Sequence, residues 1–169
     1  KTLGINVFGP DVNESKLKFS VNATGDVRFG LGAIKGVGEG AVENILQERN
    51  ANGPFTSIYN FVERINLTAC NKKCIESMIL AGAFDSFTDI KREQYFEVAS
   101  DGEIFIDSLI KYGTRYQVDQ QAQHNSLFGD FEEIDIAKPQ PSKSYAGWSD
   151  IERLNKERDL IGIYISAHP

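Results

Sequence analysis

The sequence is poor in the residues that build disulfide frameworks or metal sites, since its 169 residues include two cysteines and two histidines. Two cysteines make no disulfide framework, so a reducing compartment is the simpler assumption. Cys70 and Cys74 lack the further ligands of a zinc site, and we expect both in the core. No apolar run approaches the roughly 18 residues of a membrane span, which excludes an integral membrane protein. The opening residues, Lys1-Thr2-Leu3, contain neither a Met nor a leader, which predicts a piece of a longer protein.

An excess of positive charge is also absent. The chain has 18 basic and 24 acidic residues, a net charge of −6. Residues 1–100 carry 11 basic and 12 acidic side chains, and residues 101–169 carry 7 and 12. No general basic field therefore attracts a polyanion. If the chain binds nucleic acid, the contact must come from the first hundred residues and depend on local geometry.

The hydropathy pattern predicts a mainly α-helical fold with a small N-terminal β-hairpin. Apolar residues alternate on both sides of a turn at residues 22–26, which predicts the hairpin. Three amphipathic helices follow, over about 39–50, 57–65 and 72–80. Thr56 or Ser57 and then Asn71 are the expected N-caps, and Gly82 is the expected stop of the third helix.

The second part of the chain has a weaker pattern. Residues 90–99 and 104–112 are compatible with helices, although Asp101-Gly102 interrupts them. Between residues 113 and 147 the composition shifts to Gln, Asp, Glu, Pro and Ser, which predicts a flexible linker. Trp148 then opens a last amphipathic helix to about Asp159.

The segment Leu31 to Val42 carries the strongest chemical signal. Gly36, Gly38 and Gly40 stand at alternate positions, where the backbone can turn sharply and present its N–H groups. The helix that begins near Glu39 adds unpaired N–H groups and a positive dipole end. Val37 is expected to point inward, and Lys35 adds a charge. The segment therefore predicts a phosphate-binding loop.

Three kinds of anion-binding loop compete for this segment. A nucleotide-binding loop needs Ser or Thr after Lys35, and none follows. A dinucleotide fingerprint needs a further glycine in register and a chain in which strands and helices alternate, whereas here that glycine is missing and helices follow helices. The remaining interpretation is a helix-hairpin-helix element, with a short helix over 30–34 and its hairpin at Gly36-Val37-Gly38. The competing structural interpretation is a simple helix-capping turn.

A second, degraded copy of the element is predicted further along the chain. The helix over 72–80 runs into Ala81-Gly82-Ala83-Phe84, and another helix is expected near Asp89. Gly82 and Ala83 are then candidate DNA contacts. Because this turn has one glycine, a purely structural role is the alternative.

The chain resembles the alpha subunit of bacterial DNA polymerase III in several ordered motifs that cover nearly its whole length. These motifs are Phe29-Gly30-Leu31-Gly32-Ala33-Ile34-Lys35-Gly36-Val37-Gly38-Glu39, Gly53-Pro54-Phe55, Asn71-Lys72-Lys73 with Glu76, Ala81-Gly82-Ala83-Phe84-Asp85 and Leu160-Ile161-Gly162-Ile163-Tyr164-Ile165-Ser166-Ala167-His168-Pro169. The resemblance implies four parts. They are the end of the fingers domain with the β-hairpin (1–30), a tandem helix-hairpin-helix region (31–112), a linker (113–147) and the start of a clamp-binding and OB-fold region (148–169).

The resemblance implies a DNA-directed DNA polymerase, a nucleotidyltransferase of the bacterial cytoplasm, as the parent protein. Its catalytic aspartates and their Mg²⁺ ions belong to a palm domain upstream, so we expect no catalytic residue, metal ligand or cofactor here and no activity of this piece alone. Expected partners are double-stranded DNA, the sliding clamp (the beta subunit) and other polymerase III holoenzyme subunits.

A clamp-binding peptide is implied at residues 123–128. Gln123, Leu127 and Phe128 resemble the family's motif of Gln, two residues and Leu-Phe, but three residues separate Gln123 from Leu127 here. An exposed Leu-Phe pair suits a pocket on a partner. The alternative is that both side chains fold back onto the helices.

The sequence thus predicts a non-catalytic piece that holds duplex DNA without reading its sequence and helps to tether the polymerase to its clamp. The expected DNA contacts are Lys35, Gly36, Val37, Gly38, Gly40, Arg28, Gly82 and Ala83. Two alternatives remain open: a structural or protein-interaction module that links polymerase domains, and a part of an error-prone alpha-like polymerase.

Overall fold

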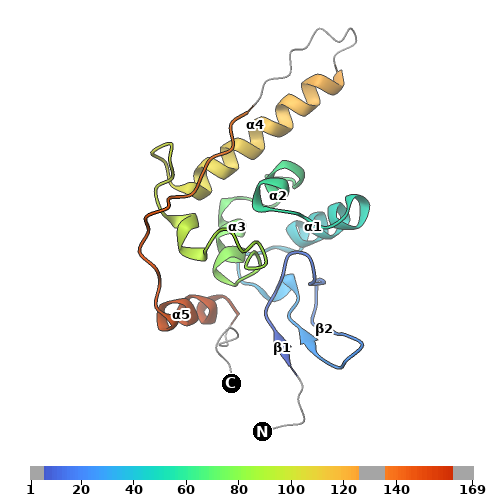
Figure 1. The fold of residues 1–169 in the computed structure, drawn as a ribbon. Coiled ribbons are helices and arrows are strands. Elements are labelled where there is room, and N and C mark those ends of the chain that lie inside the picture. Colours follow the sequence, from blue (N-terminus) through green and yellow to red (C-terminus); the bar gives the residue numbers. More distant parts are fainter. Residues whose placement is uncertain (1–5, 126–135, 162–169) are drawn as a thin grey trace.

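The fold is mainly helical with one small sheet, as predicted (Figure 1). The computed structural model describes residues 6–125 and 136–161. Its elements are β1 (Val7–Phe8), β2 (Ser20–Val21), β3 (Val27–Arg28), the 3-10 helix η1 (Leu31–Ala33), α1 (Glu39–Asn52), α2 (Ile58–Arg64), α3 (Lys72–Leu80), the 3-10 helix η2 (Arg92–Phe96), α4 (Phe105–Asn125) and α5 (Asp150–Ile161). Within the described ranges, no helix has both the length and the apolar character that crossing a membrane requires.

The sheet contains the predicted β-hairpin and one further strand. β2 and β3 are antiparallel, with Val21 opposite Val27. β1 pairs with the other edge of β3 in parallel, and Val7 is opposite Val27. β1 pairs with a strand twenty residues further along the chain, Val7 with Val27, and the pattern of a single sequence carries no signal for such a pairing.

Helices α2 and α3 begin where a capping side chain stands before them. The Ser57 hydroxyl accepts a hydrogen bond from the Asn60 amide at 3.0 Å. The Asn71 side chain accepts one from the Cys74 amide at 3.1 Å. Both residues are N-caps, as predicted, because their side-chain oxygens satisfy an N–H that the helix leaves unpaired.

The three helices share one apolar core. Phe61 of α2 packs edge-on against Phe55 and Phe84, with ring centroids 5.0 Å away in each case. Cys70 and Cys74 are buried in this core, as expected, with their sulfur atoms 3.1 Å apart. The hydrogen bond with Cys74 and burial together raise the pKa of the Cys70 thiol. Each fully buried large apolar side chain contributes about 1.5–3 kcal/mol.

The prediction of a flexible linker is wrong for residues 113–125, because they form the second half of α4. Gly113 is buried against α2, and a Cβ there would lie 2.6 Å from the Val62 carbonyl oxygen. The Gln117 amide group donates to the carbonyls of Val62 and Ile65 at 2.9 and 2.7 Å. The glutamine-rich composition suggested a linker, whereas Gln117 satisfies the carbonyl end of α2. Beyond this contact α4 projects away from the other helices (Figure 1).

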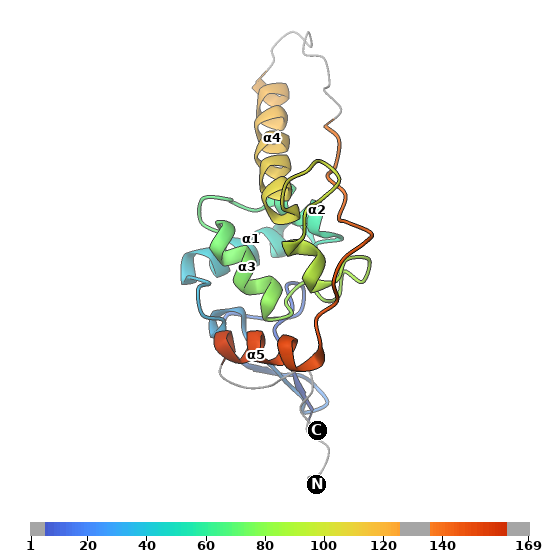
Figure 2. The same cartoon turned by 90° about the vertical axis from the view of Figure 1, so that its left-hand side faces the viewer.

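Residues 136–149, here called the strap, contain no helix or strand, as predicted for 136–147, but are hydrogen-bonded to the helices. The last helix begins at Asp150, two residues later than the predicted start at Trp148. The Tyr59 hydroxyl donates to the Pro139 carbonyl at 2.6 Å. The Trp148 amide donates to the Glu93 carboxylate at 2.8 Å, and its ring stacks on Phe96 with centroids 5.9 Å apart. The strap leads into α5, which crosses below α3 and packs against it (Figure 2).

Candidate nucleic-acid interface

The first hairpin joins η1 to α1. Gly36 has a φ of +89°, and a Cβ added to it would lie 2.7 Å from the Ser77 hydroxyl of α3. Glycine is required for both reasons, because the left-handed backbone disfavours other residues and α3 leaves no space. Val37 is 7% exposed and belongs to the same apolar cluster as Ile34 and Val42, as predicted. The buried valine fixes the turn against the core.

The N-terminus of α1 has no capping side chain. Gly38 is its N-cap, and the first helical hydrogen bond runs from the Val42 amide to the Gly38 carbonyl at 3.1 Å. A helix leaves its first N–H groups without an acceptor of its own. Within residues 6–125 and 136–161, nothing accepts a hydrogen bond from the amides of Gly38, Glu39 or Gly40. These three residues are exposed, and we call their N–H groups the amide face.

Two other amides of the hairpin are already used inside the molecule. The Lys35 amide donates to the Leu160 carbonyl at 3.0 Å, and the Val37 amide donates to the Ile34 carbonyl at 3.3 Å. The expectation that Val37 offers its N–H to phosphate is therefore wrong, because this bond closes the turn. The Lys35 side chain is exposed and can still add a positive charge beside the hairpin.

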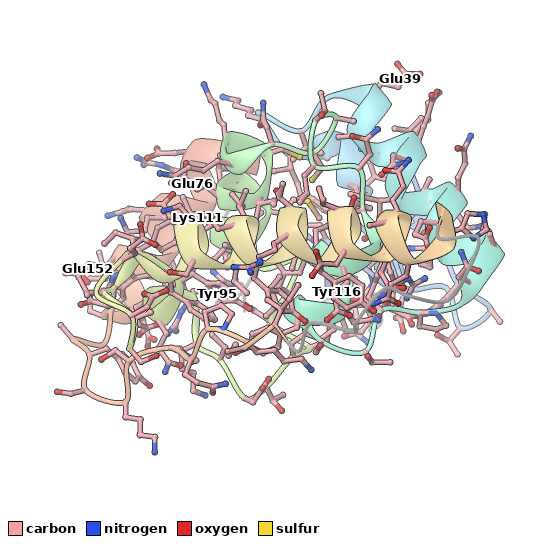
Figure 3. All side chains as sticks on the ribbon, turned by 90° about the horizontal axis from the view of Figure 1, so that it is seen from above. Glu39, Glu76, Tyr95, Lys111, Tyr116 and Glu152 are labelled. Atoms are coloured by element: carbon pink, nitrogen blue, oxygen red, sulfur yellow. The ribbon has the colours of Figure 1, made fainter. Side chains whose placement is uncertain are left out.

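The amide face has open space in front of it. A Cβ placed on Gly38 or on Gly40 would meet no atom within 4 Å. Glu39 extends outward from the start of α1 (Figure 3), where its negative charge opposes an approaching anion. Three aligned N–H groups at the positive end of a 14-residue helix can hold one phosphate group.

The second hairpin is closed. Gly82 has a φ of +91° and follows the end of α3. Its amide donates to the Ile79 carbonyl at 3.1 Å, and the Ala83 amide donates to the Met78 carbonyl at 2.9 Å. These two bonds form a Schellman motif, in which the turn satisfies the last carbonyls of its own helix. The expectation that Gly82 and Ala83 present amides to DNA is corrected accordingly, whereas Gly82 as the stop of α3 is confirmed.

An ion cluster centred on the buried Arg92 lies against the second hairpin. Arg92 is 7% exposed, and its guanidinium donates to Asp85 at 2.9 Å and contacts Glu157 of α5 at 2.7 Å. A Cβ on Gly82 would lie 2.5 Å from this guanidinium. Burial alone would lower the pKa of Arg92, but its bonds with Asp85 and Glu157 raise it, so the group stays charged.

Arg28 lies beside the second hairpin, since it borders a cavity of about 200 Å³ together with Gly82 and Arg92. Its guanidinium donates to the Gly9 carbonyl at 3.0 Å and sits 4.9 Å from the centre of the Phe8 ring. These contacts hold Arg28 against the sheet, and the structure does not group it with the amide face.

The comparisons with known proteins agree with this geometry. The sequence model of the helix-hairpin-helix motif family matches residues 4–95, which contain both hairpins. The chain belongs to this family. Over its whole length the helix-hairpin-helix chain is also similar to three proteins named DNA polymerase III subunit alpha. It is 38% identical to that of Mycobacterium tuberculosis, 39% to that of Deinococcus radiodurans and 32% to that of Vibrio cholerae. The resemblance found in the motifs is therefore confirmed, and the chain spans 12–14% of the length of these relatives.

Of the three predicted clamp-binding residues of the helix-hairpin-helix chain, the structure describes Gln123. Gln123 lies in the last turn of α4 and is partly buried. Leu127 and Phe128 lie outside the described residues. The clamp-binding role of all three therefore stays a prediction.

Sequence reasoning missed three residues near the hairpins, namely Arg92, Glu157 and the backbone of Leu160. Each acts through a partner far away in the sequence, as in the bond from the Lys35 amide to the Leu160 carbonyl. The pattern of a single sequence carries no signal for such pairs.

Proposed function

We propose that the first hairpin binds the sugar-phosphate backbone of duplex DNA without reading its sequence. The amides of Gly38, Glu39 and Gly40 donate hydrogen bonds to a phosphate oxygen. The turn at Gly36 orients these amides, and the Lys35 side chain adds a positive charge. The observation that carries this proposal is the uncapped N-terminus of α1, which exposes three N–H groups. Backbone N–H groups and helix N-termini are common phosphate ligands in protein–DNA complexes, and such contacts carry no sequence information.

The second hairpin is left out of this interface. Its two candidate amides are occupied within the Schellman motif, so it contributes no main-chain donor at Gly82 or Ala83. The number of phosphates held is then about one or two, and the expected affinity lies near the nonspecific range of about 10⁻⁴–10⁻⁶ M.

We also propose that the full-length protein is a DNA-directed DNA polymerase of bacterial chromosome replication. Its similarity to the alpha subunits supports this proposal. In this proposal the catalytic residues and their Mg²⁺ ions belong to other parts of the polypeptide. The helix-hairpin-helix chain holds the duplex behind the active site, in contact with the other holoenzyme subunits in the cytoplasm.

Tethering to the sliding clamp is the finer part of the proposal. Its support is the motif at Gln123, Leu127 and Phe128 and the position of Gln123 at the projecting end of α4 (Figure 1). Burying a leucine and a phenylalanine supplies about 1.5–3 kcal/mol each. The cost of ordering the peptide leaves an affinity of about micromolar or weaker.

Titration of a fluorescently labelled duplex tests the DNA-binding proposal. The expected logarithmic slope of affinity against salt is about −0.9 for each phosphate held, and two unrelated duplex sequences are expected to bind equally. The alternative is a module that only connects polymerase domains, and the closed second hairpin favours it. That alternative predicts no DNA affinity even at low salt, which would exclude the proposed function.

A further inference from the structure

A buried ion pair joins α5 to Arg92 of η2, whose guanidinium borders the second hairpin at Gly82. Glu157 is 1% exposed, and its carboxylate lies 2.7 Å from the Arg92 guanidinium. Arg92 also donates to the Leu80 carbonyl at 3.3 Å, in the last turn of α3. Without Glu157, Arg92 keeps its ion pair with Asp85, whose side chain is 52% exposed, but loses its buried partner, which makes the contact costly to break. The pair therefore fixes α5 to the end of α3.

The same end of α5 also reaches the first hairpin. Leu160 is three residues after Glu157, which is about one turn and about 4.5 Å along a helix. Its carbonyl accepts the hydrogen bond from the Lys35 amide at 3.0 Å. The last turn of α5 thus bonds directly to the first hairpin and reaches the second hairpin through Arg92 of η2. Figure 2 shows α5 crossing below α3.

We propose that α5 is a brace that sets the position of the amide face, and that Arg92 and Glu157 are positioning residues for DNA binding. This inference rests on the proposed function. Lys35 directly precedes the Gly36 turn, so anchoring its amide anchors the peptide planes that lead to Gly38. Hydrogen bonds to a phosphate require donor–acceptor distances of about 2.7–3.2 Å, and a hairpin that moves loses them.

The brace acts through position and adds no attraction. The C-terminal end of a helix is electronegative, and Glu157 is buried away from solvent. Loss of the brace should therefore weaken DNA binding without changing its salt slope, because the number of phosphates held stays the same. This pattern separates a positioning residue from a direct phosphate contact.

The test is Glu157→Gln in the 169-residue chain, with Asp159→Asn as the matched control. Asp159 lies on the same helix, its side chain is 74% exposed, and the substitution removes the same charge. Hydrogen exchange is measured by NMR at the Lys35 amide and, as a reference for global stability, at the Phe61 amide of α2. The affinity for a labelled duplex is measured at several salt concentrations.

Glu157→Gln is expected to speed exchange at Lys35 at least tenfold relative to Phe61, as expected when a buried pair loses one charge. It is also expected to weaken DNA binding about three- to tenfold at an unchanged salt slope, because misplaced donors lose part of a charge-assisted hydrogen bond. Asp159→Asn should change neither. If Glu157→Gln does not fold, Leu160→Gly, which loosens the last turn alone, should give the same two effects.

Unchanged exchange at Lys35 would overturn the brace, and so would faster exchange with undiminished DNA affinity. Absence of DNA binding by the unaltered chain would instead overturn the proposed function. In that case the exchange data would still show whether the ion pair holds α5 on the hairpin, so the two failures are distinguishable.

Discussion

Replacing Gly38 separates the stability of α1 from its ability to bind an anion. Gly38 has φ −72° and ψ 159°, a conformation open to any residue, and a Cβ there meets nothing within 4 Å. An asparagine at this position can accept a hydrogen bond from an N–H in the first turn, as Asn71 does from Cys74 at the start of α3 at 3.1 Å. Its side chain then occupies the space that we assign to a phosphate oxygen.

Gly38→Asn should have opposite effects on stability and binding. Asparagine is a better N-cap than glycine, and it should raise the free energy of unfolding by about 0.3 kcal/mol. A hydrogen bond to a charged group contributes about 1.5–3 kcal/mol, so DNA affinity should fall at least about tenfold. One phosphate contact fewer lowers the magnitude of the salt slope by about 0.9.

The assay combines urea unfolding with duplex titration at several salt concentrations. Gly38→Ala is the matched control, because alanine adds a Cβ but no acceptor. It should lower stability by about 0.5–1 kcal/mol and leave DNA affinity unchanged. If Gly38→Asn binds DNA as tightly as the unaltered chain, the amide face is not the phosphate site.

Three further substitutions test the surrounding structure. Glu39→Gln should raise DNA affinity about two- to fivefold at low salt by removing an exposed repulsion, and a gain that persists at high salt would contradict that origin. Gly113→Ala should cost about 1–3 kcal/mol in urea unfolding through overpacking against Val62, despite alanine's better helix propensity; no loss would contradict the close contact of α2 and α4. Burial and the nearby charge of Asp89 raise the pKa of Tyr59 from 10.0 to about 12, so its contribution to stability is complete below pH 10 and is lost as the pH rises toward 12. Tyr59→Phe should remove this pH-dependent stability and also the hydrogen bond to the strap, which contributes about 1 kcal/mol. Tyrosinate absorbance that shows Tyr59 ionising near pH 10 would refute the raised pKa.

The parts of the fold that depend on neighbouring residues were predictable from the sequence. Ser57 and Asn71 cap their helices, and Gly82 ends α3, through bonds within a few residues. The turn at Gly36 was predictable for the same reason. These features follow from capping and glycine chemistry, which act over one helical turn.

The parts that depend on distant contacts were not predictable. Residues 113–125 have the composition of a linker, but Gly113 and Gln117 fit the end of α2 and make them helical. Likewise, whether an amide of a hairpin is free depends on what packs beside it. The Lys35 amide donates to a carbonyl of α5, and the amides of Gly82 and Ala83 donate to carbonyls of α3 in the Schellman motif.

NMR titration of the ¹⁵N-labelled chain with a short duplex tests the central claim most directly. The account predicts that the amide signals of Gly38, Glu39 and Gly40 shift first and most, with those of Gly82 and Ala83 unchanged. Binding that leaves the three amide-face signals in place would contradict it, because the DNA would then be held by another surface.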